Sequence, residues 1–225
     1  MPVNELFSRN LPTLTEAEQT ALAEKRVFLA GCGGLGGFVS EFLVRAGVGH
    51  ITAADCDRFS PTNRNRQLLS LESTEGRSKV RSAAARARDI HPGVDFRPVE
   101  ARLDSENLPA LLAGCELAMD ALDNVPARLA LEDACAAAGI PLVHGAVQGW
   151  AAQAAVALPG SGLLHTLYAG AAGKTDSSVL SPVPAMCAAV QCAEAIKLLL
   201  GRPSELAGKL LLMDLRGMDF TVIEL

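Results

Sequence analysis

The chain has 225 residues, of which 49% are hydrophobic and 20% charged, a composition typical of a globular protein and not of a disordered one. The formal net charge of −5 argues against a general nucleic-acid binder, because that function needs clustered cations on phosphates. The first 25 residues show no targeting pattern, and no run of 18 apolar residues occurs, so we expect a cytoplasmic protein that does not enter a membrane.

Apolar residues recur with alternating strand and helix periodicity along the first part of the chain. A helix over residues 13–25 precedes a strand over 26–30, a glycine turn, a helix over 36–46 and a strand over 50–55. The alternation continues with a helix at 78–90, a strand at 94–99, a helix at 105–112, a strand at 115–120, a helix at 125–138 and a strand at 141–145. This order predicts an α/β fold with a Rossmann-like, doubly wound, mostly parallel sheet.

The pattern changes after residue 146. A strand at 151–158 is followed by a stretch at 160–181 rich in Gly, Ser and Thr, which we interpret as a loop. A helix over 184–200 then leads to two antiparallel strands at 209–214 and 219–224. We expect one domain over residues 1–225, made of an N-terminal helical arm (1–25), a nucleotide-binding core (26–146) and a substrate-side extension (147–225).

A glycine-rich turn joins the first core strand to the following helix. Gly31, Gly33 and Gly36 form a G-x-G-x-x-G pattern, and Gly34 adds a fourth glycine. Such a turn lets backbone N–H groups approach a nucleotide. Asp55 ends the next strand, where an acid can accept hydrogen bonds from ribose hydroxyls. We therefore predict nucleotide binding, with a turn used only for packing as the alternative.

A polar, basic segment follows Asp55. Residues 57–67 (DRFSPTNRNRQ) contain three arginines, two asparagines and a glutamine, and Lys79 opens the next helix, where its charge adds to the N-terminal dipole. These side chains suit a polyphosphate, although a solvated basic loop is the alternative. A nicotinamide oxidoreductase, which the glycine turn also allows, would leave these cations unexplained.

These motifs together resemble the MoeB/ThiF/HesA family, relatives of the ubiquitin-activating enzymes. The family pattern is a GxGGxG turn, an Asp-x-Asp, an Asn-x-x-Arg-Gln, a Gly-x-x-Lys and an Asp-Asn with an arginine shortly after. The chain carries the glycine turn followed in order by Asp55/Asp57, Asn63/Arg66/Gln67, Gly76/Lys79 and Asp123/Asn124 with Arg128. The resemblance implies a Rossmann-like enzyme that uses ATP to adenylate a carboxylate.

The resemblance also implies a role for each matching residue. Nucleotide binding falls to the four turn glycines and to Asp55, Asp57, Asn63, Arg66, Gln67, Lys79, Asp123 and Asn124. Among these, Gly34 and Asp55 would hold the adenosine, and Asn63, Arg66 and Lys79 would contact the phosphates. Asp123 would hold Mg²⁺, with Asn124 in support. Arg9 matches an N-terminal arginine that reaches across a homodimer to the partner's ATP, so the implied catalytic set is Arg9, Arg66, Lys79 and Asp123.

The six cysteines depart from the family pattern. Many members bind a structural zinc through two C-x-x-C pairs, which this chain lacks, so we predict no zinc. Some members form a thioester or persulfide on a cysteine of the crossover loop, yet residues 160–181 contain no cysteine. Adenylation is therefore better supported than a later thiol transfer, for which Cys187 is the remaining candidate.

The substrate that the resemblance favours is the C-terminal glycine of a small ubiquitin-like sulfur-carrier protein ending in Gly-Gly. Residues 62–67 (TNRNRQ) also resemble the branch that acts on tRNA, the threonylcarbamoyladenosine dehydratases, and a non-catalytic nucleotide-binding module stays open as well. Three further residues have two interpretations each. Asp120 is a structural acid or a second metal contact, His144 a packing residue or a catalytic one, and Trp150 a packing residue or part of a substrate channel.

Overall fold

The computed structural model describes residues 4–170 and 178–225, and within them one eight-stranded sheet forms the centre of the molecule. The strands from β3 to β5 are parallel, and the pairs from β5 to β8 are antiparallel. In spatial order they are β3 (Asp95–Val99), β2 (His50–Ala54), β1 (Arg26–Ala30), β4 (Leu117–Asp120), β5 (Leu142–Gln148), β6 (Ala151–Ala157), β7 (Lys209–Asp214) and β8 (Asp219–Glu224). The predicted fold class is confirmed.

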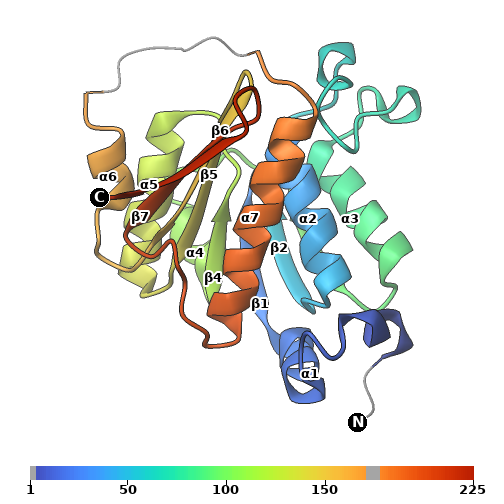
Figure 1. Ribbon diagram of the computed structural model, residues 1–225. Helices are drawn as coiled ribbons and strands as arrows, with labels where there is room; N and C mark the ends of the chain where they lie inside the picture. The colour runs from blue at the N-terminus through green and yellow to red at the C-terminus, as the bar shows by residue number, and fades with distance from the viewer. Residues whose placement is uncertain (1–3, 171–177) are drawn as a thin grey trace.

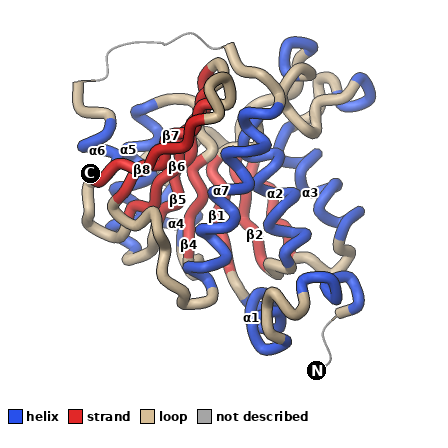
Figure 2. The backbone as a smooth tube through the Cα atoms, in the orientation of Figure 1, coloured by secondary structure: helices blue, strands red, loops and turns tan. Residues whose placement is uncertain are grey.

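Helices cover both faces of the sheet, and each face has its own hydrophobic core (Figures 1 and 2). On one face lie α2 (Gly34–Ala46), α3 (Lys79–Ile90) and α7 (Pro182–Leu199). On the other lie α4 (Leu108–Leu112), α5 (Val125–Ala138) and α6 (Leu163–Leu167). The N-terminal arm, made of the 3₁₀ helix η1 (Glu5–Asn10) and α1 (Glu16–Glu24), lies at the end of the molecule where α2 ends.

Local chemistry accounts for the element boundaries. A capping box starts α1, because Thr15 Oγ1 accepts from the Glu18 amide at 3.2 Å and Glu18 Oε2 accepts from the Thr15 amide at 2.8 Å. Helix α2 ends at Gly47, whose φ of 95° suits a glycine. The short strand β1 is buried from Val27 onward, as parallel central strands usually are.

The strand order determines where a ligand can bind. The chain runs outward from β1 through β2 to β3 and then returns to β4 on the other side of β1. The loops after β1 and β4 therefore lead to opposite faces of the sheet, and at such a switch point open α/β sheets bind ligands beyond the carboxyl ends of their strands. The glycine turn follows β1, and Asp123 follows β4, so both lie at this switch point.

Several predicted element boundaries differ from the structure; helix α1, for example, begins at Glu16, three residues after the predicted start at 13. The stretch 160–181, expected to be a loop, contains α6, and its residues 171–177 lie outside the described residues. Helix α4 starts at Leu108, three residues after the predicted start at 105. Strand β5 extends to Gln148 because it pairs with β6 over seven residues, whereas the sequence pattern ended it at 145.

Helix α7 is, within the described part of the chain, the one helix whose length and composition would allow it to cross a membrane. Its apolar side chains pack in the protein core, however. Five of them are buried against α2 and the sheet, namely Val183, Cys187, Ala188, Cys192 and Ala195. The composition is therefore that of a core helix.

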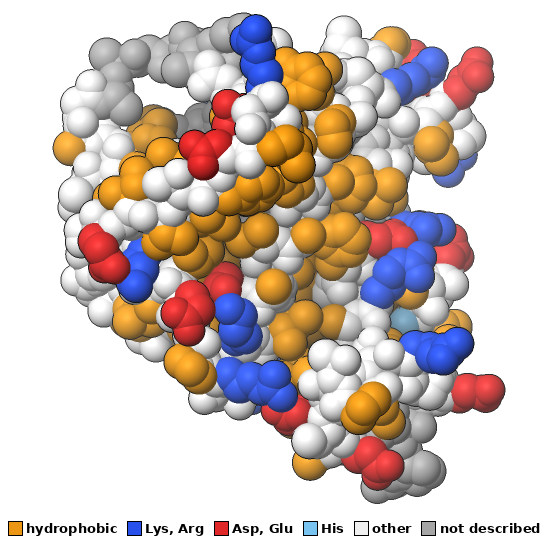
Figure 3. Space-filling model, in the orientation of Figure 1, with side chains coloured by type: hydrophobic (Ala, Val, Ile, Leu, Met, Phe, Trp, Pro, Cys, Tyr) orange, Lys and Arg blue, Asp and Glu red, His pale blue; other side chains and the backbone are white. Residues whose placement is uncertain are grey.

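The β7–β8 hairpin exposes apolar side chains. Figure 3 shows hydrophobic side chains gathered across the middle of one face, over the hairpin and α7. On the hairpin the large exposed ones are Leu212, Met218, Phe220, Val222 and Ile223. Strand β8 is also an edge strand, and its six residues are exposed. Contiguous apolar surface of this kind is typical of a protein contact.

Candidate active site

The four glycines of the turn differ in why the structure needs a glycine at each position. A Cβ at Gly36 would lie 1.9 Å from the Gly31 carbonyl oxygen, and one at Gly31 would lie 2.7 Å from the Ala121 carbonyl oxygen. These two glycines permit close packing between the turn, α2 and the loop after β4. Cβ atoms at Gly33 and Gly34 would make only ordinary contacts, the nearest being the Gln67 side chain at 3.7 Å and the Arg66 side chain at 3.6 Å. Close packing therefore does not explain these two glycines, and this part of the turn can serve as a cradle for a ligand.

Asp55 binds the turn from the end of β2. Its Oδ2 accepts from the Cys32 amide at 2.7 Å, and its Oδ1 accepts from the Asp57 amide at 2.7 Å. Burial raises the pKa of Asp55, against the opposing effect of these two amides. The carboxyl group thus lies at the position expected for a ribose contact, with its orientation fixed by two backbone hydrogen bonds.

Lys79 lies beside Asp57. Its Nζ donates to Asp57 Oδ2 at 2.8 Å, and the Lys79 side chain is 9% exposed while that of Asp57 is 59% exposed. The hydrogen bond from Lys79 lowers the pKa of Asp57. Ser78 caps α3, so Lys79 is the first residue of that helix and its charge adds to the helix dipole. An anion at this place would meet a fixed, nearly buried cation.

The basic loop is folded over the glycine turn. Asn63 Oδ1 accepts from the Ser60 amide at 3.0 Å, and Arg66 Nη1 donates to the Thr62 carbonyl at 3.1 Å. The Arg66 and Gln67 side chains are those that face Gly34 and Gly33. Gln67 Oε1 is buried without a hydrogen-bond partner among the described residues. A buried, unpaired acceptor beside an open cradle is a position that a ligand's donor can satisfy.

Asp123 is exposed and lies in the loop between β4 and α5. The Asn124 side chain caps α5 by accepting from the Ala127 amide at 3.0 Å, and its Nδ2 lies 3.4 Å from Asp123 Oδ1. Within the described residues no cluster of three or more His, Cys, Asp or Glu side chains could hold a metal by itself. Mg²⁺ commonly takes one or two carboxylates plus phosphate oxygens, so Asp123 fits a Mg²⁺ that arrives with a nucleotide.

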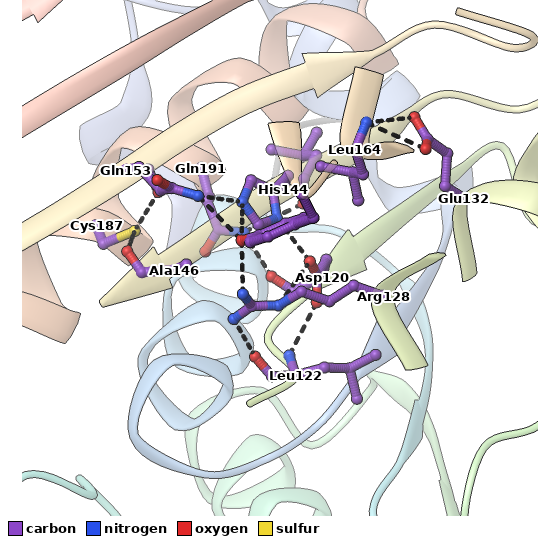
Figure 4. Close-up of polar contacts among 12 residues, drawn as sticks. Asp120, Leu122, Arg128, Glu132, His144, Ala146, Gln153, Leu164, Cys187 and Gln191 are labelled. Carbon is purple, nitrogen blue, oxygen red and sulfur yellow. Dashed lines mark hydrogen bonds and ion pairs between the residues drawn. The ribbon is translucent and has the colours of Figure 1, made fainter. Parts of the chain in front are cut away.

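Asp120 and His144 have structural positions. Both side chains are fully buried, and His144 Nδ1 lies 2.7 Å from Asp120 Oδ2 (Figure 4). Asp120 Oδ1 accepts from the Leu122 amide at 2.9 Å, so both of its oxygens are occupied by the protein. The structure therefore favours the interpretation of Asp120 as a structural acid and of His144 as a packing residue.

A cavity of about 580 Å³ opens beside the basic loop. Three segments line it, namely the basic loop with Arg66, the β5–β6 turn with Trp150, and residues 178–180. Trp150 is 48% exposed, which is unusual for a packing residue and agrees with a place in a substrate channel. Asn65 Nδ2 donates to the Val179 carbonyl at 3.1 Å, which joins the first and third of these segments.

Arg9 is the one predicted site residue that lies apart from the others. It is exposed, in η1, and the adjacent Asn10 donates to the Ala46 carbonyl at the end of α2. The glycine cradle is at the start of this 13-residue helix. With a rise of about 1.5 Å per residue, the two ends of α2 lie about 20 Å apart. Arg9 therefore does not reach the cradle of its own chain.

The cysteines offer little nucleophilic chemistry. Burial raises the pKa of Cys187 to about 12 and raises that of Cys135 to about 12 as well. The thiolate is the reactive form, so a later thiol transfer on Cys187 is unsupported. The prediction that the chain binds no zinc stays a prediction.

The fold and the site define a Rossmann-type α/β protein with a nucleotide cradle at the switch point of its sheet. Residues 7–225 match the ThiF family model, and the chain belongs to the ThiF family, as the sequence motifs predicted. It is 36% identical to the SAMP-activating enzyme E1 of Haloferax volcanii, over 91% of this chain and 78% of that protein. It is also 36% identical to the molybdopterin-synthase adenylyltransferase of Escherichia coli, over 92% of this chain and 86% of that protein.

A third relative is the sulfur carrier protein adenylyltransferase of Thermus thermophilus, 33% identical over 91% of this chain and 80% of that protein. Among solved structures, MccB of E. coli with ATP superimposes with a TM-score of 0.84, over 98% of this chain and 72% of that one. Its sequence identity is 19%, so this likeness supports the fold.

Proposed function

We propose that this protein uses ATP and Mg²⁺ to adenylate the C-terminal carboxylate of a small ubiquitin-like sulfur-carrier protein. One observation carries the proposal: the Arg66 side chain lies against the glycine cradle at Gly34, and the loop that carries Asp123 packs against the same turn at Gly31. The relatives named above add the chemistry, because they are an activating enzyme and adenylyltransferases, one of them for a sulfur carrier protein.

The reaction needs positioning and charge more than a protein nucleophile. A carboxylate oxygen of the carrier attacks the α-phosphorus of ATP, the bond from that phosphorus to the bridging oxygen breaks, and pyrophosphate leaves. Both reactants are anions, so fixed cations lower the barrier. Lys79 and Arg66 supply such cations, and Asn63 helps to shape the loop that holds Arg66. Removing one such contact typically costs a factor on the order of 10²–10³ in rate.

Asp123 would hold Mg²⁺, which neutralises phosphate charge when it is bound. Asp55 would bind the ribose, because its carboxyl group is already fixed next to the cradle by Cys32 and Asp57. Gln67 would complete the nucleotide contacts through its unpaired Oε1.

The shape of the surface supports a protein as the substrate. The exposed apolar strip of the β7–β8 hairpin continues toward the cavity, because Leu215, in the hairpin turn, donates its amide to the Trp150 carbonyl at 3.1 Å. A folded carrier bound to this strip could extend its C-terminal tail past Trp150 to Arg66. A small-molecule acid would have no use for the strip.

We further propose a homodimer in which each copy supplies Arg9 to its partner's site. Arg9 lies at the far end of α2 from its own cradle, and a two-fold arrangement that sets α2 antiparallel to its copy would bring each arm to the other cradle. Such a site would be incomplete in the monomer.

The test is ATP–pyrophosphate exchange with Mg²⁺ against a panel of carrier proteins ending in Gly-Gly, each paired with a control that lacks the last glycine. We expect exchange that depends on one carrier and on its intact C-terminus. If the protein binds ATP and exchanges with none of them, the carrier proposal is wrong. A tRNA carrying threonylcarbamoyladenosine would then be the next substrate to assay, and turnover with neither would indicate a binding module.

A further inference from the structure

A buried polar cluster contacts the backbone of Leu122, the residue before Asp123 (Figure 4). It brings together side chains from β4, α5, β5, β6 and the segment after α6, namely Asp120, Arg128, His144, Gln153 and Tyr168. None of the predicted nucleotide contacts belongs to this cluster, and the mechanism above does not use it. Buried polar networks of this kind hold backbone in place through their hydrogen bonds, and in this one Arg128 Nε is buried without a hydrogen-bond partner among the described residues.

The hydrogen-bond directions within the cluster can be assigned. The Tyr168 hydroxyl oxygen accepts from Arg128 Nη1 at 2.6 Å and from Gln153 Nε2 at 3.0 Å. Its own hydrogen is free to donate to His144 Nε2, 3.2 Å away, and Gln153 Nε2, which can only donate, lies 3.1 Å from the same ring nitrogen. With Nε2 accepting, the imidazole is neutral and carries its proton on Nδ1, which donates to Asp120 Oδ2 at 2.7 Å. Burial also lowers the pKa of His144, in agreement with the neutral form.

The cluster holds the residue before Asp123 by both of its backbone polar groups. The Leu122 amide donates to Asp120 Oδ1 at 2.9 Å, and the Leu122 carbonyl accepts from Arg128 Nη2 at 2.5 Å. Gln191 Nε2, from α7, donates to the Asp120 carbonyl at 2.9 Å. The exposed Asp123 side chain therefore projects from a backbone that buried groups restrain.

Tyr168 is itself anchored. It follows α6, whose first amides, those of Leu164 and His165, donate to the Glu132 carboxylate of α5 at 2.9 Å and 3.1 Å. The Arg128 guanidinium lies 5.4 Å from the centre of the Tyr168 ring and 3.6 Å, at Nε, from Asp120 Oδ2. The tyrosine thus connects the extension after β6 to the start of α5.

We propose that His144 and Tyr168 are positioning residues that fix Asp120 and Arg128, and through them the loop that carries Asp123. The proposal rests on the proposed function in one respect, the role of Asp123 in holding Mg²⁺ with ATP. Mg²⁺ requires near-ideal octahedral geometry at short distances, so a carboxylate on a loosened loop binds it less well. His144 and Tyr168 act through the loop and do not contact the reacting atoms.

The test uses Tyr168→Phe, which removes the hydroxyl and keeps the ring. We would titrate ATP into the purified protein by calorimetry, once with Mg²⁺ and once with EDTA. We expect about tenfold weaker binding with Mg²⁺ and no change in EDTA, because only the metal contact depends on the loop. The Leu122 amide should also exchange its hydrogen faster. Thr166→Val is the matched control, since the Thr166 hydroxyl donates to the carbonyl of Gly162, the residue just before the same helix, and to no member of the cluster.

Two substitutions at His144 add a conservative rescue. In His144→Asn the amide nitrogen takes the place of Nδ1 and keeps the donor to Asp120, whereas His144→Gln places its amide at the Nε2 position and loses that donor. We expect His144→Asn to retain Mg²⁺-dependent ATP binding within about threefold and His144→Gln to lose about tenfold.

The proposal is overturned if Tyr168→Phe binds ATP normally with Mg²⁺, or if its binding weakens equally with Mg²⁺ and in EDTA, which would indicate a general structural role. Equal losses in the two His144 variants would also contradict it. Because these titrations contain no carrier protein, they give an answer even if the carrier exchange assay fails.

Discussion

Substituting two glycines of the same turn should give opposite phenotypes. In Gly36→Ala the new Cβ would lie 1.9 Å from the Gly31 carbonyl oxygen, about 1.5 Å inside ordinary contact distance. The two atoms nearest to the new methyl group, the carbonyl oxygen and carbon of Gly31, belong to the backbone and cannot rotate away. Overpacking of this kind costs about 2–3 kcal/mol. For a chain of this size, each kcal/mol lowers the melting temperature by about 2–4 °C, so we expect a decrease of roughly 4–12 °C.

Gly34→Ala is the matched substitution. Its Cβ would meet the Arg66 side chain at 3.6 Å, an ordinary contact, and alanine favours the first turn of α2. The melting temperature should therefore change by less than about 2 °C. The same methyl group fills the open cradle, so we expect ATP to bind at least about tenfold more weakly.

Thermal unfolding by circular dichroism and ATP titration by calorimetry measure both effects on the same samples. The reasoning fails if Gly34→Ala lowers the melting temperature as much as Gly36→Ala, because the two contacts would then not differ as the structure indicates. It also fails if Gly34→Ala keeps its ATP affinity, since the cradle would then lie elsewhere.

Three other predictions concern the site and its surroundings. Asp123→Ala and Arg66→Ala should each abolish ATP–pyrophosphate exchange while the circular dichroism spectrum stays unchanged; full activity in both folded variants would contradict the site assignment. Burial lowers the pKa of His144 from its usual value of 6.5. The free energy of unfolding should therefore fall as the pH decreases from about 6.5 toward the folded pKa, because the unfolded chain binds a proton that the folded one rejects. Urea titrations from about pH 7 to about pH 5 should show this decline in the parent chain and a flatter profile in His144→Asn. Finally, EDTA should leave the melting temperature unchanged, whereas a decrease would reveal a structural metal.

The nucleotide core could be predicted from the sequence because its signals are local. The glycine turn directly follows a strand, Asp55 ends the next strand, and Lys79 opens a helix. Each lies next to the element that positions it, so the spacing in the sequence is enough to bring Asp55 and Lys79 to the carboxyl ends of the strands. The capping box at Thr15 and Glu18 is local in the same way, since its two residues are three positions apart.

Features that depend on distant residues could not be predicted. Helix α6 has five residues and lies in a glycine-rich stretch, and the Glu132 carboxylate that caps it is 32 residues before Leu164. In the cluster around His144, a single hydrogen bond joins Arg128 to Tyr168, 40 residues apart in the sequence. The sequence pattern shows each of these only as an apolar or isolated polar position, so tertiary contacts decide their roles.

The position of Arg9 leads to a prediction about subunits. If each copy supplies Arg9 to the other in the proposed homodimer, an inactive Arg9→Ala subunit and an inactive Asp123→Ala subunit should complement each other. The site formed by the Arg9→Ala chain keeps its own Asp123 and receives Arg9 from the other chain, so one of the two sites is intact. Heterodimers purified with two different affinity tags should therefore recover about half of the parent exchange activity. An inactive heterodimer would show that Arg9 does not act across the interface. An active homodimer of Arg9→Ala would show that Arg9 is not needed for the reaction.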